Sequence, residues 1–254
     1  MKKLLLSGLL AVILLSAISG SIAYFTDSIS TSNTIASGNL EIALHEYKRI
    51  KNTDGSYSTQ LQKYDDGQDD LMIYPSVGDF SSAARETVSL SYPKEDGTAV
   101  TFSDVNMYVS GIGNFVDKIA AAENIGTLPL YTRIYIAVPT LEGTPLLHLD
   151  TNRDAKWEWT VISDTIDDRP HDIYIATLRS PLAPGEFTPP SLLGFYLDSS
   201  MTNKHSELLA LDDKGTMNIL VAARATQANV FESGPEEAFL ETFKAQTHPW
   251  APNQ

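Results

Sequence analysis

The stretch Met217-Asn218-Ile219-Leu220-Val221-Ala222-Ala223-Arg224-Ala225-Thr226 decides the fold class of this chain. Its odd-numbered positions are all apolar, and they alternate with a second set that includes Asn218, Arg224 and Thr226. Successive side chains of an extended strand point to opposite faces, so an alternation of this kind predicts a half-buried β-strand.

The same period of two recurs along the rest of the chain. It is found at residues 40–44, 88–92, 134–138, 157–161 and 193–197. Turn-forming pairs lie between these segments: Asp54-Gly55, Asp66-Gly67, Asp96-Gly97, Glu142-Gly143, Pro184-Gly185 and Lys214-Gly215. Many short strands joined by such turns predict an all-β protein, a jelly-roll-like antiparallel β-sandwich with long loops.

Two other segments depart from this pattern. Ser233-Gly234-Pro235-Glu236-Glu237 has the proline and acidic residues of a helix start, and Phe239, Leu240 and Phe243 then give one apolar face. We therefore expect a short C-terminal helix of about three turns. Residues 46–85 are polar and lack a clear period, which predicts a long surface excursion after the first strand.

The N-terminus has the features of a secretory signal peptide spanning residues 1–23. Lys2 and Lys3 precede an apolar run at residues 4–15, and Ser21-Ile22-Ala23 supplies small residues for cleavage between Ala23 and Tyr24. The run is shorter than the roughly 20 apolar residues that span a bilayer. An uncleaved membrane anchor is the alternative interpretation, and it is the only membrane contact that the sequence predicts.

Three stretches resemble the TasA/camelysin family of secreted bacterial proteins. Ala23-Tyr24-Phe25-Thr26-Asp27, followed by Ala36-Ser37-Gly38-Asn39-Leu40-Glu41-Ile42, matches the family's A-x-F-[TN]-D and A-x-G-x-L-x-[IL] segments. Residues 124–133 are similar to its N-x-G-x-x-P-x-Y-x-R strand, and residues 222–228 to its C-terminal strand with Gln-Ala. Each motif is short, so the resemblance rests on the set.

The resemblance implies several properties. Members are typically processed by a signal peptidase of the SipW type and form fibres in the biofilm matrix, while camelysin-type relatives have been classed as metalloproteases. It also places residues 117–123 on a strand, although Ala120-Ala121-Ala122 favours a helix by propensity. We expect a strand there.

Cleavage at Ala23 would free a segment at residues 24–38, ahead of a sandwich domain at residues 39–254. Phe25, Ile29 and Ile35 fall on one face of this segment if it is extended. Such a chain end can add itself to the sheet edge of a neighbouring copy, so these three residues are candidate donor-strand contacts. The segment could equally be the first strand of its own sandwich.

Composition limits the classes of partner. The net charge of −14 becomes −16 when the two lysines of the signal peptide are removed. An acidic surface repels nucleic acid, so we expect no nucleic-acid partner. The chain has no cysteine, which excludes thiol catalysis and thiolate metal sites.

The sequence offers few metal ligands. There is no H-E-x-x-H motif, and the five histidines are scattered as expected surface or rim residues: His45, His148, His171, His205 and His248. Asp150, Asn152 and Asp154 form a weak calcium candidate, to which Glu158 could add a ligand. Ala155 and Val161 stand where a calcium loop needs glycine and glutamate. A second acidic cluster is interpreted as a charged surface loop: Asp65, Asp66, Asp69 and Asp70.

No catalytic residue and no cofactor is predicted, since G-x-S-x-G and phosphate-loop motifs are both absent from the sequence. Trp157 and Trp159 share a face of their strand; they are core aromatics or, less often, a sugar-binding surface. The leading hypothesis is a secreted, non-catalytic fibre subunit in the extracellular matrix or at the cell surface, with its own copies or related matrix proteins as partners. The alternatives are a secreted metal-dependent peptidase and a carbohydrate-binding adhesin.

Overall fold

The computed structural model describes residues 39–54, 56–64, 84–110, 114–141, 147–200, 219–231, 233–244 and 246–251. Several expectations lie outside the described residues. These are the signal peptide, the Ala23–Tyr24 cleavage site, the donor-strand residues Phe25, Ile29 and Ile35, the acidic cluster at residues 65–70 and His205.

Seven strands form the larger sheet. In spatial order they are β4 (Ala99–Ser110), β3 (Ala84–Pro93), β2 (Tyr57–Lys63), β1 (Ile42–Lys51), β5 (Val116–Asn124), β10 (Leu192–Leu197) and β7 (Leu147–Thr151). All neighbours are antiparallel except β2 and β3, which meet in parallel at Gln60 and Ser91.

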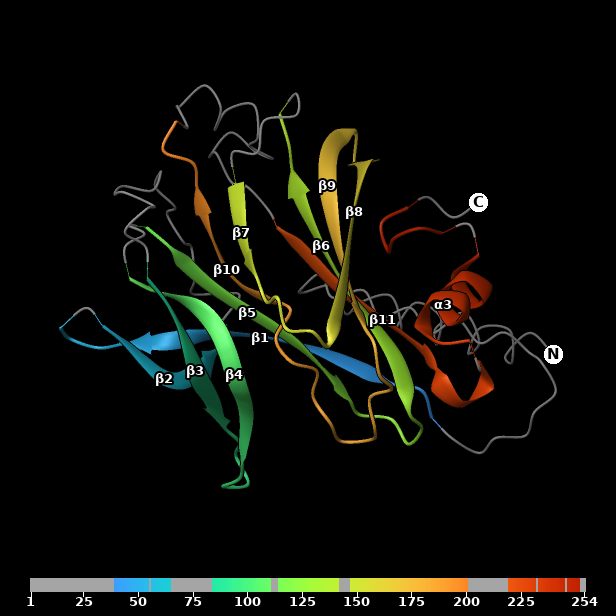
Figure 1. Ribbon diagram of the computed structural model, residues 1–254, viewed down its shortest axis with the longest axis horizontal. Coiled ribbons are helices and arrows are strands. Elements are labelled where there is room, and N and C mark those ends of the chain that lie inside the picture. Colours follow the sequence, from blue (N-terminus) through green and yellow to red (C-terminus); the bar gives the residue numbers. More distant parts are fainter. Residues whose placement is uncertain are drawn as a thin grey trace, which may run out of the picture.

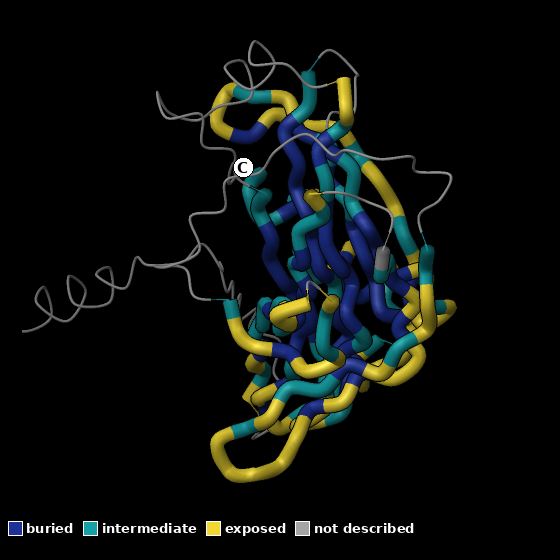
Figure 2. The backbone as a smooth tube through the Cα atoms, turned by 90° about the vertical axis from the view of Figure 1, so that its left-hand side faces the viewer, coloured by how far each residue is buried: buried dark blue, intermediate teal, exposed yellow. Residues whose placement is uncertain are grey.

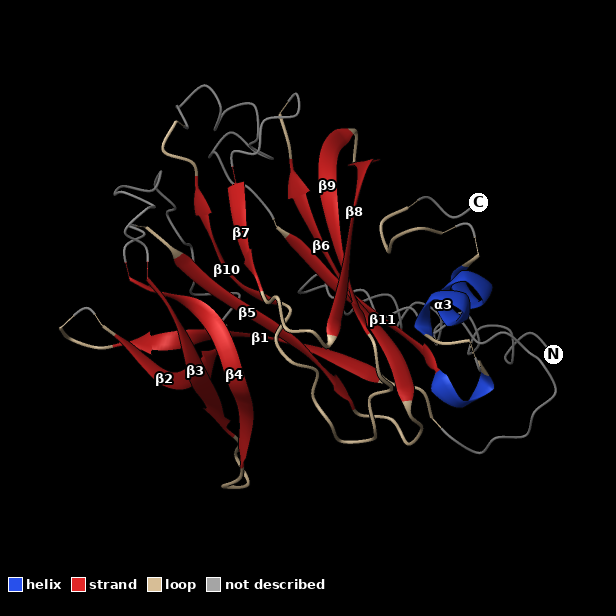
Figure 3. Ribbon diagram, viewed as in Figure 1, coloured by secondary structure: helices blue, strands red, loops and turns tan. Residues whose placement is uncertain are grey.

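Four strands form the second sheet, in the order β11 (Leu220–Gln227), β6 (Leu130–Pro139), β9 (Arg169–Leu178) and β8 (Trp157–Ile166). All three pairs are antiparallel. The two sheets pack as a sandwich, with the short helix α3 (Pro235–Phe243) beside β11 (Figures 1 and 3). The all-β expectation and the C-terminal helix are confirmed.

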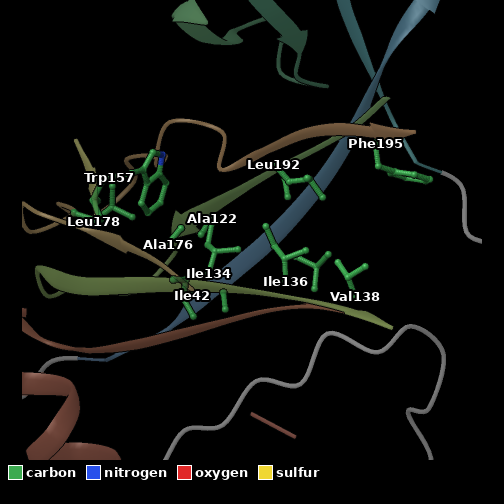
Figure 4. Packing of buried hydrophobic residues seen from close by; sticks show 14 of the residues in the cluster. Ile42, Ala122, Ile134, Ile136, Val138, Trp157, Ala176, Leu178, Leu192 and Phe195 are labelled. Carbon is green, nitrogen blue, oxygen red and sulfur yellow. The ribbon is translucent and has the colours of Figure 1, made fainter. Parts of the chain in front are cut away.

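The main core lies between the two sheets. Ile134, Ile136 and Val138 point from β6 toward the larger sheet, where Leu192 and Phe195 of β10 face them (Figure 4). The alternation at residues 134–138 predicts this inward face correctly. Buried residues are accordingly concentrated in the central strands, and exposed residues lie mainly in the connecting loops (Figure 2).

A second core lies inside the larger sheet, which curls around it. Tyr47, Leu61, Leu90 and Met107 come from four different strands and are all buried there. β5 serves both cores: Ile119 and Ala121 face this one, while Ala120 and Ala122 face the main core. Small side chains on both faces of one strand let two layers pack closely, which explains why the alanine run is a strand.

The expectation for residues 193–197 is wrong in one respect. Leu193 belongs to the second core, whereas Phe195 and Leu197 face the main core. The register of β10 shifts between Leu192 and Gly194, and such a bulge reverses the faces of the following residues. A side chain at Gly194 would lie 2.5 Å from the Val116 carbonyl oxygen, so the close approach requires glycine.

The expected surface excursion at residues 46–85 is also wrong in part. β1 continues to Lys51 and β2 follows it as a paired strand, with Leu61 buried in the second core. Polar side chains obscure the alternation here. Arg49, for example, is buried because Asp117 accepts hydrogen bonds from its backbone nitrogen and its guanidinium.

The outer face of the second sheet carries the C-terminal elements. Phe239 of α3 packs on Tyr131 and Ala228, next to the short helix η2 (Ala228–Val230). Residues 246–251 then cross the sheet, where Arg224 donates to the carbonyl oxygens of Gln246 and His248. Within the described ranges, no helix has the length and apolar character needed to cross a membrane.

Candidate functional site

The weak calcium candidate does not gather its side chains around one point. The Asp150 carboxylate is buried and accepts a hydrogen bond of 2.7 Å from the Arg85 guanidinium. Asn152 is bound to backbone atoms through both its oxygen and its nitrogen, and Asp154 accepts from the Lys156 backbone nitrogen. An arginine at the main carboxylate opposes a bound cation electrostatically.

The described histidines each have a different partner. His45, His148 and His248 lie 2.8–2.9 Å from Glu123, Asp198 and Asp164, respectively. His171 and His248 are buried, so the expectation of surface positions is wrong for both. Within the described parts of the chain, no three His, Asp or Glu side chains are grouped so that they could hold a metal ion.

The two tryptophans belong to the fold. Trp157 is buried in the main core, and Trp159 is half-buried against it while its indole nitrogen donates to the Asn152 carbonyl oxygen. The core interpretation therefore describes Trp157 fully and Trp159 in part.

A polar cleft lies where the two ends of the curled sheet meet. It has a volume of about 530 Å³. Side chains of β3 and β4 line one side of it, and side chains of β7, of the loop that follows β7 and of β10 line the other. Arg85 and Tyr108 come from the first side, and Leu149 and Tyr196 from the second. The cleft therefore joins the two outermost strands of the sheet, β4 and β7.

Arg85 is the fixed centre of this cleft. Its Nη1 donates to Asp150 at 2.7 Å, and its Nε and Nη2 donate to the side-chain and backbone oxygens of Asn106 at 2.7 and 2.6 Å. The guanidinium also lies 4.3 Å from the centroid of the Tyr108 ring. A planar cation held by three acceptors and one ring has a defined orientation.

Two irregularities of β4 border the cleft. The pairing of β3 with β4 shifts between Ala84 and Arg85 and again between Val88 and Leu90. At the second shift Asp104 has a φ of 58°, in the left-handed region that few non-glycine residues adopt. Bulges re-aim side chains, and here one directs Asp104 to the cleft lining.

Burial shifts the pKa values of two acidic groups in the cleft. Burial raises the pKa of Asp150, against the opposing effect of the Arg85 hydrogen bond and charge. Burial also raises the pKa of Tyr196, helped by nearby Tyr108, Asp198 and Asp150. Tyr196 thus keeps a neutral hydroxyl at physiological pH and stacks on His148 with ring centroids 4.9 Å apart.

A second feature is an open side of the sandwich, between the first half of β1 and β11. Residues 42–45 of β1 pair with β5, and β11 pairs with β6; no second described strand pairs with either of these edges. The two edges are close to each other. Four apolar residues of the main core are only half-buried here: Leu40, Leu44, Ile219 and Ala225.

Comparison of the sequence and structure with known families, characterised proteins and solved structures gives no match. The cleft residues Arg85, Tyr108 and Tyr196 were not predicted from the sequence. They lie on three separate strands and belong to no short motif, so only the closure of the sheet brings them together.

Proposed function

We propose that this protein is a secreted structural subunit that assembles end to end by strand addition. In this proposal the signal peptide is removed after Ala23, by a peptidase of the SipW type, and residues 24–38 of one copy pair with the open side of the next copy. Contacts between different surfaces of identical subunits do not close on themselves, so they generate fibres.

The open edges of β1 and β11 are the observation that carries this proposal. An unpaired strand edge offers backbone N–H and C=O groups to an incoming strand, and the half-buried Leu44 and Ala225 offer it apolar contacts. The apolar face of the segment, formed by Phe25, Ile29 and Ile35, would then cover them. Burial of such side chains contributes about 1.5–3 kcal/mol each.

The point where this segment joins the domain supports exchange between copies. Asn39 is held by Thr127 through two hydrogen bonds of 2.9 Å, and β1 begins three residues later. To lie along the open edge of its own β1, the preceding segment must reverse direction immediately before Asn39. In this proposal the segment continues outward instead, where it would pair with a neighbouring molecule.

Light scattering and electron microscopy of two chains test the proposal. Residues 24–254 should elongate as the concentration rises, whereas residues 39–254 should stay monomeric and should bind the synthetic peptide 24–38. Ile29→Asp should abolish elongation, and the matched change Ser30→Asp, on the opposite face of the segment, should not.

The two contrary outcomes have different meanings. If residues 24–254 stay monomeric while deletion of 24–38 lowers the melting temperature, the segment completes its own sandwich. If the chain stays monomeric and the deletion leaves stability unchanged, the segment does neither and the proposal fails.

A further inference from the structure

We infer that the cleft between β4 and β7 binds a neutral saccharide. The inference concerns a surface separate from the β1 and β11 edges and does not depend on assembly. It starts from the chemistry of the cleft lining, which combines two tyrosine rings, two arginines, two asparagines and three aspartates in a cleft of about 530 Å³.

The aromatic groups provide stacking surfaces. Tyr108 and Tyr196 line the cleft from opposite sides. The Tyr108 ring centroid lies 4.3 Å from the Arg85 guanidinium and 6.0 Å from the ring centroid of Phe115. The Tyr196 ring stacks on His148 with centroids 4.9 Å apart. Both tyrosines are half-buried, so part of each remains accessible. An amphipathic ring with a fixed orientation suits the apolar face of a pyranose.

The polar groups supply donors and acceptors in similar numbers. Arg153 is exposed at the cleft and contributes donors, while Asp104 contributes acceptors. The Oδ1 atom of Asn106 is already bonded to Arg85, and no described residue accepts from its amide nitrogen. Sugar hydroxyls both donate and accept, so they can use this mixture, whereas a purely anionic or cationic ligand uses only half of it.

Net charge argues against an anionic ligand. Arg85 is neutralised by the buried Asp150, which leaves Arg153 facing Asp104 and Asp154. The remaining charge is therefore slightly negative, and it would repel a uronate or a phosphate.

The strained residue at the rim supports a role beyond folding. Asp104 has a φ of 58°, a conformation that glycine adopts at lower cost. The aspartate places a carboxylate in the cleft lining, where it can accept hydrogen bonds from sugar hydroxyls. Asp104→Gly should therefore weaken saccharide binding while leaving the melting temperature unchanged or higher.

Binding is tested with the secreted mature protein and defined oligosaccharides. Cellohexaose and maltohexaose serve as neutral probes, and oligogalacturonate serves as the anionic one, with saturation-transfer NMR and calorimetry as readouts. We expect a neutral probe to bind, and Tyr196→Ala and Arg153→Ala to weaken its binding about tenfold. Tyr196→Phe, which keeps the ring, should retain most of the affinity.

Arg179→Ala is the matched control, because Arg179 is an exposed arginine outside the cleft. It should leave binding unchanged. If neither cellohexaose nor maltohexaose binds at millimolar concentration, the inference is overturned. A preference for oligogalacturonate, or binding that the cleft variants do not alter, would also overturn it.

Discussion

The guanidinium of Arg85, next to one edge of the seven-stranded sheet, lies 2.7 Å from the carboxylate of Asp150 on the opposite edge strand. The second oxygen of Asp150 also lies 3.4 Å from the backbone nitrogen of Tyr108 on β4. One carboxylate therefore connects the first and last strands of the sheet. This closure creates the second core and positions the walls of the cleft.

Arg85→Met should lower the free energy of unfolding by about 2 kcal/mol near neutral pH, because a buried carboxylate loses its charged partner. Burial already raises the pKa of Asp150, and removal of the arginine should raise it further. A carboxyl pKa that is raised in the folded state costs stability that is absent below the ordinary carboxyl pKa and grows as the pH rises through the raised pKa. The defect should thus be smaller at about pH 5 than at about pH 7.

Urea denaturation at the two pH values measures this difference. Arg153→Met is the control, since Arg153 is exposed and no described carboxylate forms an ion pair with it. A defect that stays constant with pH would show that Asp150 does not titrate in this range and that the ion pair has no such role.

Asp117→Leu should destabilise the protein by about 3–5 kcal/mol, because Arg49 would remain buried without its counter-charge. The two side chains are each only 4% exposed, and Asp117 accepts from both Nε and Nη2 of Arg49. The double variant Arg49→Met with Asp117→Leu should recover much of the loss. Chemical denaturation of the four chains gives the coupling, and additive losses would contradict this account.

A substitution in the turn between β8 and β9 should increase the stability of the protein. Asp167 and Asp168 form a two-residue connection with φ values of 49° and 61°, since Ile166 pairs with Arg169. Asp168→Gly should therefore raise the free energy of unfolding by about 0.5–1 kcal/mol. Thr160→Gly, within β8, should lower it by a similar amount; thermal unfolding distinguishes the two, and a loss in both would refute the turn argument.

Deletion of residues 246–254 should cost about 2–4 kcal/mol. Arg224 is only 1% exposed, and it donates to three oxygens of Gln246 and His248 that would be removed. Arg224→Leu in the shortened chain should restore part of the melting temperature, whereas no restoration would mean that the loss comes from Trp250 and its apolar contacts instead.

Alternation predicts strands where one face is buried and the other is not. It identifies residues 134–138 of β6 and 88–92 of β3, whose inward faces are confirmed. It fails at β2, where Leu61 is the only fully buried position and the flanking residues are polar. A strand with one buried residue leaves no period to detect.

Long-range pairing explains why the cleft and the buried ion pairs were not predicted. Arg85 and Asp150 are 65 positions apart, and Arg49 and Asp117 are 68 apart. Their sequence neighbours are ordinary strand residues, so nothing local marks these charges as buried. The D-x-N-x-D run at residues 150–154 has a local signal, but the structure uses its first carboxylate to close a sheet.

The attachment of Asn39 to β1 has a mechanical consequence. Residues 42–47 of β1 pair antiparallel with β5, in the middle of the strand order of the larger sheet, so a pull on the chain ahead of Asn39 acts along this ladder. Several hydrogen bonds would then bear the load at once in shear, rather than opening one after another. If copies are linked through this segment, tension would pass from one molecule to the next through the paired strands β1 and β5, leaving the outer hairpins unloaded.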